Sequence, residues 1–167
     1  MERRKFLKEL LISCIQVGLV LVILQFTICP TIVKSGSMEP TLMTNDIVIF
    51  NRLAHVFSPV ERGDIVIFWS EEYDKWFSKR VIGIAGDVIE FHGGYTFING
   101  EQYDESIYIA EDVKTYCAKT FVVPKGTVFV MGDNRESSID SRFFTNPYIP
   151  IECIKGKHLL TIPWIFD

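Results

Sequence analysis

The apolar residues near the start of the chain form one unbroken run. From Leu10 to Cys29 the sequence is almost entirely apolar, and no charged residue occurs between Glu9 and Lys34. About 20 helical residues, rising 1.5 Å each, cross a hydrocarbon core of roughly 30 Å. The pattern therefore predicts a membrane-spanning helix over residues 10–29 and excludes an ordinary soluble protein.

Two other interpretations of this segment fit less well. A cleaved signal peptide has an apolar region of about 7 to 15 residues that ends at small residues. Here the run is longer and leaves through Thr27-Ile28-Cys29-Pro30, without such a site. A buried core helix would show a polar face, but Gln16 and Gln25 are isolated. We therefore favour an uncleaved anchor.

Basic residues flank the predicted span unequally. Four of them lie within residues 1–9, whereas only Lys34 and Arg52 lie within about 20 residues after the span. Positive charge favours the cytoplasmic side of a membrane. We expect residues 1–9 to be cytoplasmic and residues 30–167 to form an extracytoplasmic domain.

The chain after the span has a β pattern. Short runs of β-branched and aromatic residues alternate with turn residues, among them Gly93-Gly94, Asn99-Gly100 and Pro124-Lys125-Gly126-Thr127. The runs are apolar at successive positions, which indicates strands covered on both faces. We predict an all-β domain of coiled antiparallel sheets in a sandwich-like arrangement, with residues 104–119 as a long excursion from it. The expected strands are 47–50, 65–69, 81–84, 88–91, 95–98, 121–123 and 128–131.

Composition and charge narrow the possible partners. The 167 residues suffice for the span and one compact domain, and after residue 9 the chain carries 13 basic and 19 acidic residues. No basic stripe with interleaved aromatics is present, so nucleic acid is not expected as a partner. Cys117 and Cys153 could be small apolar residues or one disulfide bridge. The cysteine spacing gives no zinc signature, and no metal or organic cofactor is predicted.

Three short segments carry candidate chemistry. They are Lys34–Leu42, which contains Ser-Gly-Ser, then Ser78–Gly83, and the densely charged Met131–Arg142. A serine hydroxyl is a weak nucleophile unless a base accepts its proton. Histidine is the usual base, but surface or structural roles account better for each histidine of the chain, which are His55, His92 and His158.

A lysine can replace histidine as the base if its amine is neutral. Desolvation would have to lower a pKa of about 10.4 by several units. Lys79 has apolar neighbours at same-face spacing, Phe77 and Val81, if a strand begins there. From this segment alone, a solvated lysine at a strand edge is the favoured interpretation.

Taken together and in order, the three segments resemble the conserved boxes of type I signal peptidase. The similarity covers roughly residues 32–144. The S-x-M-x-P pattern also resembles the self-cleaving repressors of the SOS response, but those carry an N-terminal DNA-binding domain and no membrane anchor. The matching residues are Ser35–Leu42, Lys79–Gly83 with Gly86-Asp87, and Gly132–Arg135 with Ser138, Asp140, Ser141 and Arg142.

The resemblance implies a role for each matching residue. Ser37 would be the nucleophile and Lys79 its general base. The backbone N–H of Ser37 and the hydroxyl of Ser35 would form the oxyanion hole, although some family members have glycine at the latter position. Ser138 would donate a hydrogen bond to the lysine amine and orient it. This chemistry requires no cofactor and no metal.

The charged residues of the third segment, Met131–Arg142 (the third box), are expected to hold the site in a fixed geometry. A carboxylate in contact with Lys79 would favour its charged form, which cannot act as a base. We therefore expect Asp133 to pair with Arg80, which points away from Lys79 by strand alternation, and Asp140 to pair with Arg142.

The family's substrates imply two shallow pockets. Signal peptides present small residues at alternate positions, and an extended chain would place them along a strand edge. Three apolar residues after the nucleophile, Met38, Pro40 and Leu42, could instead dip into the lipid surface. The candidates for lining the pockets are Ile32, Val33, Phe77 and Val81.

The predicted span and the resemblance together imply a membrane-anchored serine endopeptidase that removes signal peptides at the outer face of the plasma membrane. The lipid bilayer is an expected partner, and the translocation machinery is a further candidate. Phe143–Asn146 departs from the family pattern, since many relatives have a glycine there, and Lys79 excludes the branch that uses histidine as base. Two alternatives stay open, a mitochondrial inner-membrane peptidase of the same family and a non-catalytic membrane-tethered binding module.

Overall fold

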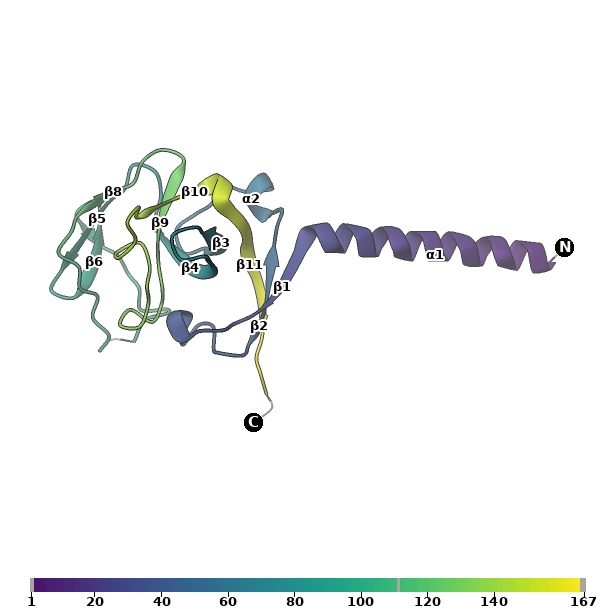
Figure 1. Cartoon of the computed structure of the whole chain (residues 1–167), viewed down its shortest axis with the longest axis horizontal. Helices are drawn as coiled ribbons and strands as arrows, with labels where there is room; N and C mark the ends of the chain where they lie inside the picture. The colour runs from purple at the N-terminus through teal and green to yellow at the C-terminus, as the bar shows by residue number, and fades with distance from the viewer. Residues whose placement is uncertain (1, 111, 166–167) are drawn as a thin grey trace.

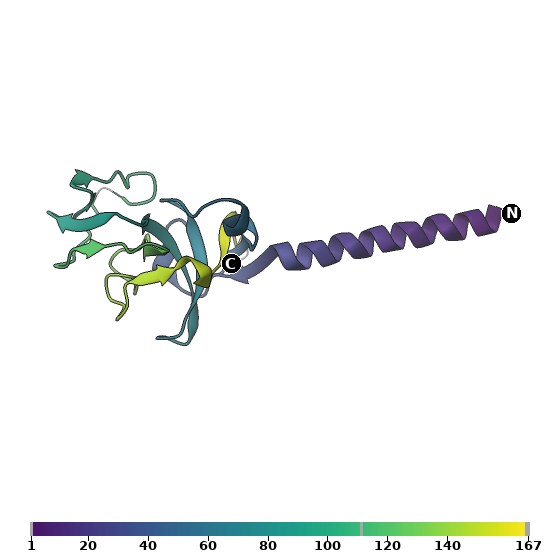
Figure 2. The ribbon, with the colours of Figure 1, turned by 90° about the horizontal axis from the view of Figure 1, so that it is seen from above.

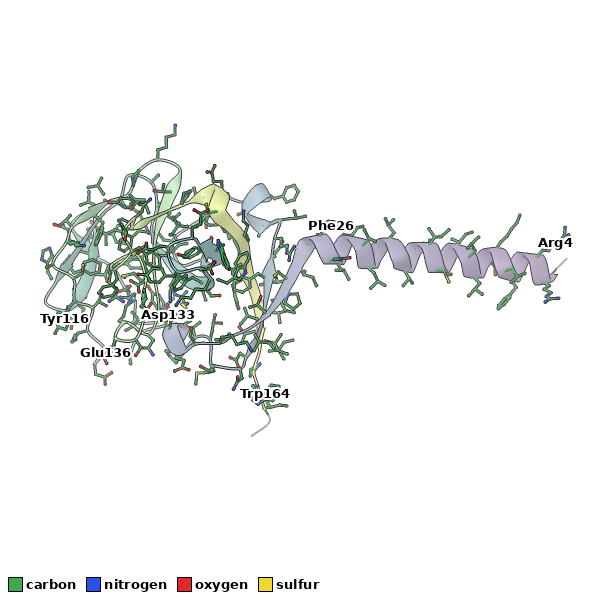
Figure 3. The ribbon with its side chains drawn as sticks, viewed as in Figure 1. Arg4, Phe26, Tyr116, Asp133, Glu136 and Trp164 are labelled. Carbon is green, nitrogen blue, oxygen red and sulfur yellow. The ribbon has the colours of Figure 1, made fainter. Side chains whose placement is uncertain are left out.

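A long N-terminal helix leads into a β domain (Figure 1). The computed structural model describes residues 2–110 and 112–165. Helix α1 (Glu2–Thr27) projects away from the domain, and its side chains, Arg4 and Phe26 among them, extend outward (Figure 3). The stretch Arg3–Thr27 is long and apolar enough to cross a membrane. None of its most apolar part is buried against the rest of the described chain.

The helix ends two residues earlier than predicted. Ile28 and Cys29 already belong to strand β1 (Ile28–Ile32), which pairs with β2 (Ile47–Asn51). Pro30 explains this boundary, because proline lacks an N–H and disfavours helical geometry in the residue before it. The predicted span therefore passes into the sheet without a linker.

The described residues of the domain form two antiparallel sheets. The order is β1-β2-β11-β3-β4-β9-β10 in the seven-stranded sheet and β7-β6-β5-β8 in the four-stranded sheet, which lies at the end of the domain remote from α1 (Figures 1 and 2). Three short helical turns are η1 (Gly36–Met38), α2 (Ala54–Phe57) and η2 (Ile151–Cys153). The remaining strands are β3 (Ile65–Ser70), β4 (Lys75–Gly83), β5 (Val88–His92), β6 (Tyr95–Ile98), β7 (Glu101–Gln102), β8 (Phe121–Val122), β9 (Thr127–Met131), β10 (Tyr148–Pro150) and β11 (Ile154–Ile162).

The predicted all-β class is confirmed, and each of the seven expected runs overlaps a strand, although Ile84 and Val123 lie just beyond β4 and β8. The prediction missed β1, β7, β10 and β11. Strand β11 is the most important omission, because it lies between β2 and β3 and joins the two parts of the large sheet. It contains Lys155-Gly156-Lys157-His158, which lacks an apolar period.

The core forms on both sides of the central strands, as the apolar runs predicted. Val81 of β4 packs into one cluster with Phe68 and Val130, while its neighbour Ile82 packs into another with Phe129, between the two sheets. A third cluster holds Met38 and Leu42, which are 2% and 1% exposed. The alternative that these two side chains dip into lipid is therefore wrong. Instead, both side chains pack into the core and hold the segment after Ser37 against it.

The tight packing between the sheets can be tested at Gly83. A Cβ atom there would lie 2.4 Å from Cδ1 of Ile89 and 3.1 Å from Cγ2 of Val123. Gly83→Val should lower the free energy of unfolding by about 1–3 kcal/mol, because overpacking displaces these side chains. Denaturant unfolding in detergent micelles measures the effect. Gly18→Ala is the control, since nothing lies within 4 Å of its added Cβ, and equal stability of both variants would contradict the packing.

Candidate active site

Ser37 lies in the short turn η1, between β1 and β2. Before the turn, Val33 N donates a hydrogen bond to Asp46 O at 2.9 Å. After it, the buried side chain of Met38 holds the chain against the core. The serine is thus fixed on a short loop whose two ends are both attached to the large sheet.

Lys79 lies on β4, between β3 and β9, and its side chain is completely buried. Its Nζ is 2.7 Å from Oγ of Ser37, a residue 42 positions earlier in the chain. Phe77 occupies the same face of the strand, with its ring centroid 5.3 Å from the lysine Nζ. The structure therefore brings together the two residues that the sequence analysis singled out as nucleophile and base.

Burial lowers the pKa of Lys79 from 10.5 to about 8. The charge of Asp140 opposes this shift, whereas the positive charges of Lys75 and Arg142 add to it. Desolvation disfavours the charged form of an amine, so a substantial fraction is neutral at mildly alkaline pH. A neutral amine at hydrogen-bond distance can accept the proton of the Ser37 hydroxyl.

Both predicted ion pairs of the third box are present. Arg80 donates to Asp133 through two nitrogens at 2.8 and 2.6 Å, and Arg142 donates to Asp140 at 2.8 and 2.9 Å. Asp133 lies among the packed side chains of the interior, whereas Glu136 reaches the surface (Figure 3). Bidentate pairing of this kind fixes geometry as well as charge.

A third buried ion pair was not foreseen. Arg135 binds Glu105, donates to Thr115 Oγ1 at 2.6 Å, and donates from Nε to Gly132 O at 3.1 Å. The excursion over residues 104–119 is therefore fastened to the third box. In the sequence, the only signal for this contact was that Arg135 had no assigned partner. Residues 104–119 show no hydrophobic periodicity that would have predicted it.

The predicted hydrogen bond from Ser138 to the lysine amine is absent. The Ser138 Oγ is buried and has no hydrogen-bond partner among the described residues. Instead the side chain packs against Gly132, where an added Cβ would lie 2.2 Å from Ser138 Oγ and 2.3 Å from Ser37 O. Only glycine permits this approach of the third box to the serine turn.

A groove of about 1320 Å³ opens beside the serine and lysine. Its lining includes Ile32, Val33 and Phe77 from the predicted pockets, together with Ser35 and Ser37. Val81 was wrongly included in this set. It shares the face of Phe77 but lies farther along β4, where it is 0% exposed and packs into the core.

The histidines and cysteines have other surroundings. His158 Nε2 lies 2.9 Å from Thr161 Oγ1, and burial lowers its pKa. His92 is exposed beside Glu90, and the side chain of the third histidine, His55, lies outside the described part of the chain. Cys117 and Cys153 are free and pack against different core clusters. Among the described residues, no group of His, Cys, Asp and Glu could hold a metal ion.

Comparison with known proteins identifies the family. The family described as signal peptidase, peptidase S26, matches residues 4–164. The chain belongs to the signal peptidase family. Signal peptidase I P of Bacillus subtilis subsp. natto is 36% identical over 84% of this chain and 82% of that protein. Signal peptidase IB of Staphylococcus aureus (strain Mu50 / ATCC 700699) is 33% identical over 82% of each chain.

A solved structure of the same family has the same fold. The crystal structure of a signal peptidase I from Enterococcus faecalis V583 is 27% identical, covers 60% of this chain and 97% of that one, and gives a TM-score of 0.52. The family membership predicted from the three boxes is confirmed, and the repressor alternative is excluded.

The cost of burying Lys79 gives a test of its environment. The folded amine loses its proton near pH 8 and the unfolded amine near pH 10.5. The penalty for burying the charge is therefore complete below pH 8 and disappears as the pH rises to 10.5. Lys79→Met should unfold at a higher temperature than wild type at pH 7, and this advantage should shrink by pH 10. Thermal unfolding in detergent micelles measures it.

The exposed Lys125 provides the control for this comparison. Lys125→Met should not gain the advantage over wild type that Lys79→Met shows at pH 7, because the Lys125 side chain is exposed when the chain is folded. An advantage of Lys79→Met that stays constant between pH 7 and pH 10 would contradict the shifted pKa.

Proposed function

We propose that this protein is a membrane-anchored serine endopeptidase that removes N-terminal signal peptides from exported preproteins, with Ser37 as nucleophile and Lys79 as general base. One observation carries the proposal. A completely buried lysine amine lies 2.7 Å from a serine hydroxyl beside a groove, in a chain of the signal peptidase family.

The proposed reaction proceeds through an acyl-enzyme. Ser37 Oγ attacks the scissile carbonyl carbon while Lys79 Nζ takes the hydroxyl proton. The tetrahedral intermediate then expels the new N-terminal amine, which takes the proton from Nζ. In the second half, Nζ accepts a proton from the attacking water and returns it to Ser37 Oγ as the signal peptide is released.

The negative charge of the tetrahedral oxygen needs hydrogen-bond donors. We assign this role to the backbone N–H of Ser37 and the hydroxyl of Ser35. Ser35 immediately precedes η1, is exposed, and makes no capping hydrogen bond to the turn with its side chain. Both residues line the groove, so a substrate there can reach both donors.

The groove suits an extended peptide with small side chains. It borders β1, which is the edge strand of the large sheet and offers unpaired backbone groups to a peptide. Ile32, Val33 and Phe77 provide apolar walls. The paired residues Asp133, Asp140, Arg80 and Arg142 have supporting roles in this proposal, whereas the role predicted for Ser138 is not retained.

We place residues 1–9 in the cytoplasm and the domain from residue 30 onward outside, at the plasma membrane. The basic residues before the span support this orientation, and the similar proteins named above are bacterial. A purely structural binding module would leave the cost of burying the Lys79 amine unexplained. The bilayer is a partner through α1, and the translocation machinery is a further candidate partner.

The serine and lysine assignments can be tested by substitution. Ser37→Ala should abolish both preprotein cleavage and labelling by a serine-acylating inhibitor. Lys79→Arg should also be inactive, because guanidinium stays protonated. The wild-type rate should rise with pH through about 8, as Lys79 loses its proton. The measurement is cleavage of a purified preprotein in detergent micelles between pH 6 and pH 10.

The control for these variants is Ser137→Ala, which alters an exposed serine of the third box and should cleave at the wild-type rate. Activity in Lys79→Arg, or a pH midpoint near the value of about 6.5 typical of histidine, would refute the lysine as base.

The orientation can be tested with a membrane-impermeant maleimide. Glu71→Cys lies in the exposed turn between β3 and β4, and Phe6→Cys lies before the predicted span without removing a basic residue. In intact spheroplasts the reagent should label Glu71→Cys at once, and Phe6→Cys only after permeabilisation. The wild type reports the background from its own cysteines. The reverse pattern would place the domain in the cytoplasm.

A further inference from the structure

One residue of the third box, Asn134, holds the turn that carries Ser37. Its side-chain Nδ2 donates to Gly36 O at 3.0 Å, and its backbone N–H donates to Ser37 O at 3.2 Å. Its Oδ1 accepts a hydrogen bond from Ser137 N at 3.3 Å. Because both ends of the amide are used, the nitrogen must face Gly36.

The carbonyl of Gly36 and the N–H of Ser37 belong to the same peptide group. This group is planar, so in the trans form its C=O and N–H point in opposite directions. Gly36 O also accepts a hydrogen bond from Glu39 N at 3.2 Å within the turn, and Asn134 adds a second donor from a separate loop. Donors that fix the Gly36 carbonyl also fix the direction of the Ser37 N–H. Hydrogen bonding at the carbonyl further polarises the group and strengthens the N–H as a donor.

The position of Asn134 is itself constrained by its neighbours. Asp133 is buried in the ion pair with Arg80, and Arg135 is buried in the ion pair with Glu105. Because the residues directly before and after Asn134 are both held in salt bridges, the backbone of Asn134 has little conformational freedom. An amide held in this way can fix a peptide group on another loop.

We infer that Asn134 is a positioning residue for the oxyanion hole. It acts through the Gly36–Ser37 peptide group and orients the Ser37 N–H before substrate arrives. The inference rests on the proposed function, because it takes that N–H as a donor to the tetrahedral oxygen. Asn134 itself donates to Gly36 O and is not a catalytic residue.

The test compares Asn134→Ala and Asn134→Asp with wild type. The aspartate retains an acceptor for Ser137 N but has no hydrogen to donate to Gly36 O. In both variants kcat should fall by roughly 10- to 100-fold, somewhat less than the loss of a whole donor, while KM changes by less than about threefold. Asn146→Asp is the matched control, because this exposed asparagine accepts from Tyr148 N, and it should behave as wild type.

Two inhibitors separate positioning from a general structural effect. A peptide aldehyde forms a tetrahedral adduct with the serine, so its affinity should fall by the same factor as kcat/KM. An uncleavable peptide of the same sequence makes only ground-state contacts and should bind Asn134→Ala as tightly as wild type. The pH midpoint of Asn134→Ala should also be unchanged, since the contacts of Lys79 are retained.

A kcat of Asn134→Ala within twofold of wild type would overturn the inference. Equal weakening of the aldehyde and the uncleavable peptide would overturn it as well, because the residue would then serve only the fold. Failure of the proposed function gives a different result, namely a wild-type protein that does not cleave a preprotein or a Ser37→Ala variant that does.

Discussion

The desolvation of one lysine amine is the constraint on which the rest of the structure depends. A lysine in water stays protonated at neutral pH and cannot take a proton from serine. Lys79 lies on the central strand β4, which pairs with β3 and β9 on its two edges, and the side chain of Lys79 is completely buried. This burial disfavours the protonated form of the amine. The same burial that lowers its pKa to about 8 makes the folded state less stable at neutral pH than an apolar residue would. The apolar core around β4 has to offset that cost.

The charges near the lysine are arranged so that they do not cancel this effect. A free carboxylate beside the amine would restore its proton, yet Asp133 and Asp140 are both close enough to act on its pKa. Each carboxylate instead forms a salt bridge with an arginine, Asp133 with Arg80 and Asp140 with Arg142. Buried ion pairs contribute little net stability but fix geometry well. The third box can therefore approach the serine turn through Gly132 without bringing uncompensated negative charge with it.

The sequence predicts those features that depend on local pattern. The predicted span and the seven apolar runs follow from local pattern, because helix length and strand composition act over a few residues. The two arginine pairs were expected from strand alternation and charge complementarity. The contact between Ser37 and Lys79, which lie 42 positions apart, was expected only from the resemblance to a known family. Strand β11 was not predicted, since its pairing with β2 and β3 uses backbone groups that any sequence provides. Val81 shows a second limit. Alternation tells which face a residue occupies, but not how far along the strand the core ends and the groove begins.

The third box shows the limit of reasoning from single contacts. Ser138 was expected to contact the lysine, but within the described part of the chain its hydroxyl has no hydrogen-bond partner, and Asn134 makes the hydrogen bonds to the serine turn instead. No periodicity distinguishes these two polar residues, because both lie in an irregular loop. Their roles depend on where Arg80, Arg142 and the excursion over residues 104–119 hold that loop.

The direct passage from helix to sheet also determines where the proposed chemistry can occur. Helix α1 ends at Thr27, β1 begins at Ile28, and Ser37 follows nine residues later. A chain spans at most about 3.3–3.6 Å per residue, so the serine cannot lie much more than roughly 30 Å from the end of the span. The segment between Thr27 and Ser37 sets this maximum distance, whatever the arrangement of the rest of the domain. In the proposed function, this distance suits a peptide bond that follows closely on an apolar segment, which is where the cleavage site of a signal peptide emerges from the membrane.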